Sequence, residues 1–240
     1  MASGATKTDE EHGADGHTHG SWLQHHFDTP IQQFDTAKLG MWLFLAQEVL
    51  FFSGLFVWYG VARVNYPEAF VAGSAQLDRV IGGFNTCVLL ISSFTAAMAV
   101  RSAQLGDRKW TSYNLLITIA CAFAFLVIKY FEYKAKFDHG LLPGYHWHPH
   151  LDELHTWAEG QTVVSALPAN THVFFGIYFV LTGLHGIHVA IGIGILFWIW
   201  LRNQRGEFSK AFWTPVDISV LYWHLVDLIW IYVFPLLYLI

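Results

Sequence analysis

The residue of this sequence best placed to do chemistry is a glutamate inside a long apolar run. Glu48 lies well within the apolar stretch from Leu39 to Gly60. At about 1.5 Å rise per residue, a helix starting near Leu39 puts this carboxyl roughly 14 Å deep, close to the middle of a ~30 Å hydrocarbon core. A charge at that depth is costly, so acids there tend to face protein. Glu48 is therefore either a proton-handling or regulatory acid, or a buried carboxyl hydrogen-bonded to a neighbouring helix.

Three further pairs of ionisable residues lie within or at the edge of apolar runs. Each pair has i, i+3 spacing, so both members share one helix face. For each pair we expect a structural contact, with a proton-related role as the alternative. The pairs are Lys129 with Glu132, which can reach the interface by snorkelling, His185 with His188, and His224 with Asp227. The candidate buried polar or proton-related residues are thus Glu48, Glu132, His185, His188, His224 and Asp227.

The two histidines of the fourth apolar run, His185 and His188, invite a metal or haem interpretation. A haem with two histidine ligands usually takes them from facing helices, and the other histidines in or beside the membrane are His172 and His224. The sequence has no HExxH motif, and no acid lies near the two histidines in their run. We therefore expect structural histidines, and no catalytic, cofactor-binding or metal-binding residue in this chain.

The remaining histidines are concentrated in two polar segments. Histidine-rich tracts can bind metal. We expect a solvated N-terminal tail, and we regard the later loop as the better candidate for weak copper or zinc binding. The tail holds His12, His17, His19, His25 and His26, and the loop holds His139, His146, His148, His150 and His155.

The composition excludes an ordinary soluble domain. Of the 240 residues, 54% are hydrophobic and only 13% are charged, against about 25% charged in soluble proteins. The sequence has no basic patch with interleaved aromatic residues, so we exclude nucleic acid as a partner. Cys87 and Cys121 both lie in apolar runs and form neither a disulfide framework nor a metal-ligand spacing.

Five apolar runs are long enough to span a bilayer, which predicts an all-α membrane bundle of five transmembrane helices. Residues 1–36 form a polar, histidine-rich and flexible tail, and residues 37–240 form one membrane domain. The runs are Leu39–Ala62, Val80–Val100, Ser112–Tyr133, His172–Leu201 and Asp217–Ile240.

Small residues recur every four positions in the fourth run, at Gly186, Ala190 and Gly194. This spacing lets another helix approach closely. The approaching helix can belong to this chain or to another subunit, and the sequence does not decide between them.

The distribution of basic residues predicts an orientation. With the N-terminus in the cytoplasm, eight basic residues lie on that side and four on the other, which favours a periplasmic C-terminus. The eight are Lys7, Lys38, Arg101, Arg108, Lys109, Arg202, Arg205 and Lys210, and the four are Arg63, Arg79, Lys134 and Lys136.

The motifs around these residues resemble subunit III of the haem-copper oxidases, the cytochrome c oxidase family. The stretch Lys38–Phe56 is similar to the family helix that carries a buried glutamate, which falls on Glu48. Glu132-Tyr133 resembles the helix-ending Glu-Tyr of the family. The most specific segments are Thr182–Val189 and Tyr222–Trp230, in this order and spacing.

The resemblance implies an accessory subunit of a proton-pumping terminal oxidase that reduces oxygen to water. Such a subunit binds neither haem nor copper, which belong to partner subunits. It packs on the catalytic subunit I, retains phospholipid, supports proton uptake and protects the enzyme against turnover inactivation. The mitochondrial form has seven membrane helices and five-helix forms look bacterial, so the resemblance implies a bacterial inner membrane. The cleft that holds lipid in the seven-helix form then lacks two of its helices.

Two alternatives remain at this point. The same scaffold also fits a quinol oxidase or a nitric oxide reductase, which differ in their partner subunits. A different class of function is a stand-alone proton-coupled transporter that uses Glu48 and Glu132.

Overall fold

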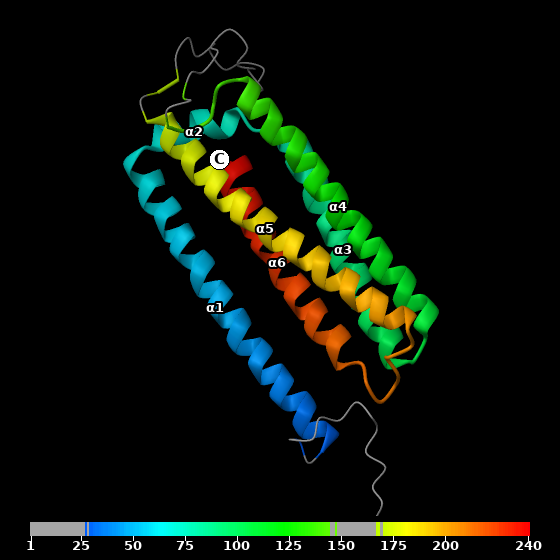
Figure 1. The fold of residues 1–240 in the computed structure, drawn as a ribbon. Helices are drawn as coiled ribbons and strands as arrows, with labels where there is room; N and C mark the ends of the chain where they lie inside the picture. The colour runs from blue at the N-terminus through cyan, green and yellow to red at the C-terminus, as the bar shows by residue number, and fades with distance from the viewer. Residues whose placement is uncertain (1–26, 28, 145–146, 148–166, 169) are drawn as a thin grey trace, which may run out of the picture.

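A computed structural model describes residues 27, 29–144, 147, 167–168 and 170–240. These residues form six helices, of which five are long and apolar enough to cross a membrane (Figure 1). The prediction of an all-α bundle with five spanning helices is thereby confirmed. The helices are α1 (Pro30–Asn65), α2 (Pro67–Ala75), α3 (Arg79–Gln104), α4 (Arg108–Asp138), α5 (Thr171–Gln204) and α6 (Thr214–Tyr238).

The spanning helices extend beyond most ends of their apolar runs, and polar side-chain caps mark where three of them begin. The helix α1 begins at Pro30, where the Thr29 hydroxyl accepts a hydrogen bond from the Gln32 amide at 3.2 Å. Asp78 and Asp107 cap α3 and α4 in the same way. The predicted start of the membrane domain at residue 37 therefore falls inside α1, and residues 1–26 and 28 of the predicted tail lie outside the described residues.

The short helix α2 was not expected from the sequence. It has nine residues, begins with Pro67 at its first position and carries Glu68 in its first turn. Both residue types favour a helix start. Nine residues are too few for a periodic hydrophobic pattern to stand out, which is why the sequence indicated only a polar linker here.

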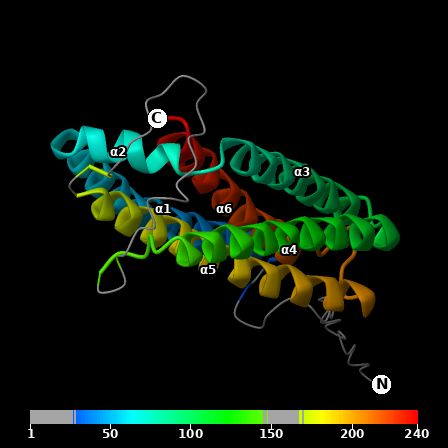
Figure 2. The same cartoon turned by 90° about the horizontal axis from the view of Figure 1, so that it is seen from above.

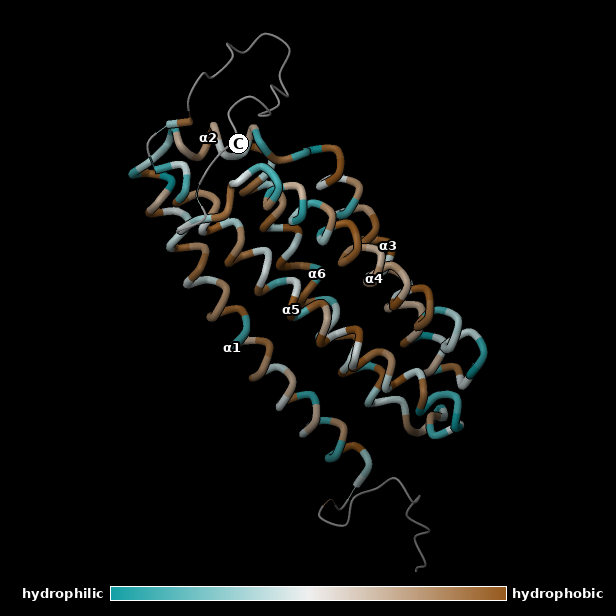
Figure 3. The backbone as a smooth tube through the Cα atoms, turned by 45° about the horizontal axis from the view of Figure 1, so that its top comes forward, coloured by the Kyte–Doolittle hydropathy of each residue, from teal (hydrophilic) through white to brown (hydrophobic). Residues whose placement is uncertain are grey.

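The helices α3 to α6 form a bundle, and α1 lies along one side of it (Figures 1 and 2). Within the bundle α3 packs on α4 and α6, and α5 packs on the same two helices. The helix α1 contacts α6, α5 and α2, and α2 crosses one end of the molecule near the C-terminus. Hydrophobic residues dominate the middle of the helices in Figure 3.

The helix α1 is peripheral, whereas α6 is central. In the apolar window of α1 only 11% of the residues are buried, against 50% in α6. The buried positions of α1 include Leu45, Phe52 and Tyr59, spaced seven residues apart. Residues seven apart form one narrow stripe along a helix. The chain therefore covers α1 on one side only.

The glycines of α5 that the sequence singled out, Gly186 and Gly194, are not where another described helix approaches α5 closely. A methyl group added at Gly186 or Gly194 would meet no atom within 4 Å. Gly192 is the close-approach position instead, because a Cβ there would lie 2.8 Å from the Trp223 ring. Among the described residues, neither Gly186 nor Gly194 makes a close approach to another helix of this chain, which was one of the two alternatives.

Candidate functional site

Glu48 and His188 meet in the membrane and form the centre of the candidate site. The Nε2 atom of His188 lies 3.0 Å from Oε2 of Glu48, which joins α1 to α5. The other ring nitrogen, Nδ1, lies 2.7 Å from the carbonyl oxygen of Leu184. Since a carbonyl only accepts, this network assigns a hydrogen to Nδ1. One further proton then lies between Nε2 and the carboxyl, either on the imidazole or on Glu48.

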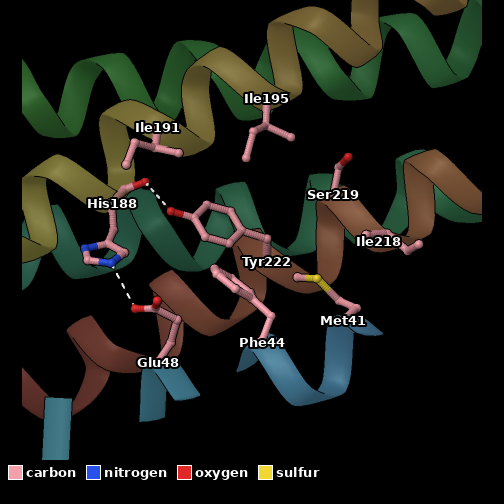
Figure 4. A pocket seen from close by; sticks show the side chains of 9 residues that line it. All are labelled: Met41, Phe44, Glu48, His188, Ile191, Ile195, Ile218, Ser219 and Tyr222. Carbon is pink, nitrogen blue, oxygen red and sulfur yellow. Dashed lines mark hydrogen bonds and ion pairs between the residues drawn. The ribbon is translucent and has the colours of Figure 1, made fainter. Parts of the chain in front are cut away.

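Aromatic residues fix the position of His188. The Tyr222 hydroxyl donates to the backbone oxygen of His188 at 3.1 Å, which connects α6 to the pair (Figure 4). The Phe52 ring lies 5.2 Å from the imidazole, and Phe51 lies 6.4 Å away. The pair is therefore held from all three helices that surround it.

A pocket of about 400 Å³ lies beside the pair, between α1, α5 and α6. Glu48, His188 and Tyr222 gather at one end of the pocket, as Figure 4 shows. The remaining walls are mostly apolar and include Met41 and Ile195. A proton shared by Glu48 and His188 thus borders an apolar space that can hold a hydrophobic molecule.

A second pocket, of about 620 Å³, lies on the other side of the contact between α1 and α6. Trp42, Leu45 and Val49 of α1 line it, together with Leu225 of α6. The ionisable residue in its wall is His224. We call this space the α1–α6 groove.

Lys129 and Glu132 form a separate cluster within α4, α5 and α6. Lys129 Nζ lies 3.0 Å from Glu132 Oε2, and it also donates to the hydroxyls of Tyr178 at 3.2 Å and Tyr238 at 2.9 Å. The other carboxyl oxygen accepts a hydrogen bond from each of the same two hydroxyls, at 2.8 Å from Tyr178. Both charges are therefore satisfied by several partners.

The Lys129 and Glu132 side chains are buried inside the bundle and do not extend to the membrane interface, so we call this the sealed cluster. Lys129 is 7% exposed and Glu132 9% exposed. The ammonium group also lies 5.2 Å from the centre of the Trp230 ring, a cation–π distance. The sequence suggested the pairing but not the burial, because Tyr178 and Tyr238 are distant in the chain and their register was not visible.

His185 and Asp227 are buried without such partners. His185 is 0% exposed and packs between the rings of Trp230 at 5.0 Å and Phe125 at 5.5 Å. Within the described residues, neither of its ring nitrogens and neither carboxyl oxygen of Asp227 has a hydrogen-bond partner. His224 bonds to Ser93 at 2.7 Å. In contrast to Lys129 and Glu132, the members of the His185–His188 and His224–Asp227 pairs form no hydrogen bond with each other among the described residues.

The described part of the chain holds no group of three or more His, Cys, Asp or Glu residues that could bind a metal ion. Most of the histidine-rich tail and loop, including His146, His148, His150 and His155, lies outside the described residues.

Comparison with known proteins identifies the scaffold. The family model "Cytochrome c oxidase subunit III" matches residues 15–139 and 158–240. The chain belongs to this family.

Individual relatives agree with the family assignment. The chain is 31% identical to "Cytochrome c oxidase subunit 3" of Synechocystis sp. over 229 residues, which cover 93% of this chain and 80% of the relative. It is 27% identical to "Probable cytochrome c oxidase subunit 3" of Mycobacterium tuberculosis, covering 85% and 87%. An elephant relative, from Loxodonta africana, is 30% identical, covering 91% and 74%. The family predicted from the motifs is confirmed.

Within this subunit III scaffold, the six candidate residues fall into three places. Glu48 and His188 lie at the pocket between α1, α5 and α6, and Glu132 lies in the sealed cluster. His185, His224 and Asp227 lie around the contacts of α6 with α3 and α5. Tyr222, Tyr178 and Tyr238 were not predicted as site residues from the sequence, although Tyr222 lies two residues before His224 in the same motif.

Proposed function

We propose that this chain is the accessory, non-metal-binding subunit of a proton-pumping cytochrome c oxidase. In this proposal it packs on subunit I and other subunits of the complex, which hold the haem and copper. The relatives named above are cytochrome c oxidase subunits, which favours cytochrome c over quinol as the electron donor. The chain itself contributes no catalytic residue and no ligand to the metals.

The Glu48–His188 pair is the observation that carries a role in proton uptake. Its two groups share one proton, and they border a partly open pocket rather than lying in the buried Lys129–Glu132 cluster. The proton can pass between the imidazole and the carboxyl with a small rearrangement, because a hydrogen bond joins the two groups whichever of them holds it. The pair therefore supports proton delivery to the neighbouring catalytic subunit, and with it the turnover lifetime of the enzyme.

The outer face of α1 and the two pockets support lipid retention. Trp42, Leu50 and Val57 are more than half exposed along α1. In a membrane these side chains contact lipid or a partner subunit. The two apolar pockets on either side of the α1–α6 contact have the size and lining for acyl chains.

The placement of basic residues supports an N-terminus in the cytoplasm and a C-terminus in the periplasm of a bacterial inner membrane. The start of α1, the α3–α4 turn and the α5–α6 loop lie at one end of the bundle (Figure 1). That end carries Lys38, Arg108 and Arg202 among its basic residues. Basic residues are enriched on the cytoplasmic side of membrane proteins.

Glu48→Gln in the intact complex tests the proton-related role. Glutamine keeps the shape and one hydrogen bond but cannot ionise. We expect normal assembly and normal haem content, with an altered turnover lifetime or proton uptake. Gln47→Ala, at the exposed neighbouring position, is the matched control and should behave as wild type. An unchanged lifetime and unchanged proton uptake in Glu48→Gln would leave only a structural role for the pair.

Co-purification tests the accessory role itself. A tagged chain expressed with its genomic neighbours should be isolated with a haem-bearing subunit, and a subunit II with a copper site would identify cytochrome c as the donor. Proton-coupled transport by the purified chain alone in vesicles would contradict the accessory role and support the transporter alternative.

A further inference from the structure

Asp227 is a buried acid that the proposed function does not use. Its side chain is turned into the bundle, where the residue is 3% exposed, and neither carboxyl oxygen has a hydrogen-bond partner among the described residues. Buried polar groups almost always have such a partner, and an uncompensated buried carboxylate is costly. The hydroxyls that influence this carboxyl are those of Ser92 and Ser93 on α3, and neither of them forms a hydrogen bond to it in the described structure.

The two serines differ in whether the hydroxyl hydrogen is free to be donated to Asp227. The Ser92 hydroxyl donates to the carbonyl of Leu89 at 2.7 Å and accepts from the Trp223 indole at 3.1 Å. Its hydrogen is therefore committed to the backbone of its own helix. Ser93 instead lies 2.7 Å from Nδ1 of His224, a contact whose direction depends on the imidazole tautomer. Ser93 can thus donate to His224 or accept from it.

We propose that His224, Ser93 and Asp227 form a proton relay between the α1–α6 groove and the interior of the bundle. In the neutral state, the Asp227 acid donates to Ser93 Oγ, and Ser93 donates to a bare Nδ1 of His224. In the charged state, the imidazolium of His224 donates from Nδ1 to Ser93, and Ser93 donates to the Asp227 carboxylate. The side chains move only far enough to close the Ser93–Asp227 contact.

The transfer conserves protons at each atom. The O–H bond of the Asp227 acid breaks as its proton passes to Ser93 Oγ. The original Ser93 proton passes to Nδ1 of His224, where a new N–H bond forms. His224 lines the groove, and its Nδ1 contacts Ser93, so Nε2 is the nitrogen that exchanges its proton with a water molecule entering the groove. The buried acid therefore exchanges its proton without contacting solvent itself.

Infrared spectroscopy of the intact complex tests the relay. The carboxylic acid band of Asp227 is assigned by its loss in Asp227→Asn, and its isotope shift is followed after transfer into D₂O. Should Asp227→Asn fail to assemble, Asp227→Glu assigns the band by displacing it. The measurement reads the proton of Asp227 directly, so it is independent of whether Glu48 affects turnover.

Substitutions at the two neighbouring serines separate the relay from general packing. Ser93→Ala should slow the isotope exchange of Asp227 by about tenfold, the factor that corresponds to roughly one hydrogen bond. Ser93→Thr keeps the hydroxyl and should restore the rate, and Ser92→Ala should leave it unchanged. Exchange at the wild-type rate in Ser93→Ala would overturn the relay. The absence of any acid band that depends on Asp227 would also overturn it.

Discussion

Two carboxyls of this bundle meet a basic side chain at the same distance but in different surroundings. Glu132 lies 3.0 Å from Lys129, and Glu48 lies 3.0 Å from His188. The side chains of the first pair are 8% and 6% exposed, with two tyrosine hydroxyls bonded to both charges. Those of the second pair are 16% and 13% exposed, and they border a pocket.

The number of partners, rather than the contact distance, distinguishes the two pairs. The Lys129–Glu132 cluster fixes both charges with a closed network, and such networks hold only when every member is satisfied. The Glu48–His188 pair has one proton between two groups and room beside it. The first region should respond to substitution through stability, and the second through activity.

The largest effect is expected when the sealed cluster loses its cation. Lys129→Met leaves the Glu132 charge buried without its main partner, which should destabilise the fold by about 3–5 kcal/mol. Thermal stability of the complex and retention of this chain within it measure the loss. The double variant Lys129→Met/Glu132→Gln removes both charges and should lose less than Lys129→Met alone. An equal or larger loss in the double variant would contradict the assigned cause.

A smaller effect is expected when the cluster loses one hydroxyl. Tyr238→Phe removes a group that bonds to both Lys129 and Glu132, and should cost about 1–3 kcal/mol because those partners stay buried. Tyr232→Phe is the matched control on the same helix, because Tyr232 is 59% exposed. Equal thermal stability of the two variants would show that the network tolerates a gap.

The pocket-side pair should be less sensitive in stability than the sealed one. Glu48→Gln should change the stability of the complex by no more than about 1 kcal/mol, the range of one hydrogen bond. Glu132→Gln should cost more, because it leaves the Lys129 charge unpaired. The two variants compared in one thermal unfolding series test the contrast, and a reversed order would refute it.

No change in metal content is expected from the histidines. His185→Asn and His188→Asn should leave the haem and copper content of the complex as in wild type. His185 packs against the Trp230 ring, and His188 is hydrogen-bonded to the Glu48 carboxyl. Haem spectra and metal analysis of the purified complex measure this. Loss of either metal would place a histidine of this chain in a metal site after all.

The sequence predicted the parts of the fold that depend on local patterns. Five spanning helices follow from the length of the apolar runs, and the Glu48 and His188 motifs identified the family. Contacts between distant segments were not predictable, because Tyr178 and Tyr238 reach Lys129 only through the register of three helices. The burial of Lys129 was not predicted either. A lysine near a helix end is expected to extend its ammonium group to the membrane interface, and the tyrosines that hold it inside the bundle could not be foreseen.

The peripheral position of α1 has a consequence for how the protein is made. The helix α1 is synthesised before the other described helices, yet its main packing partner among them is α6, which is made after them, and the hydroxyl of Tyr59 donates to the backbone of Leu236. Until α6 has been inserted, α1 lacks the partner to which the Tyr59 hydroxyl bonds. Contacts between such distant segments form late in folding. Docking of α1 is thus a late step of biogenesis, after which the Glu48–His188 pair and its pocket are complete.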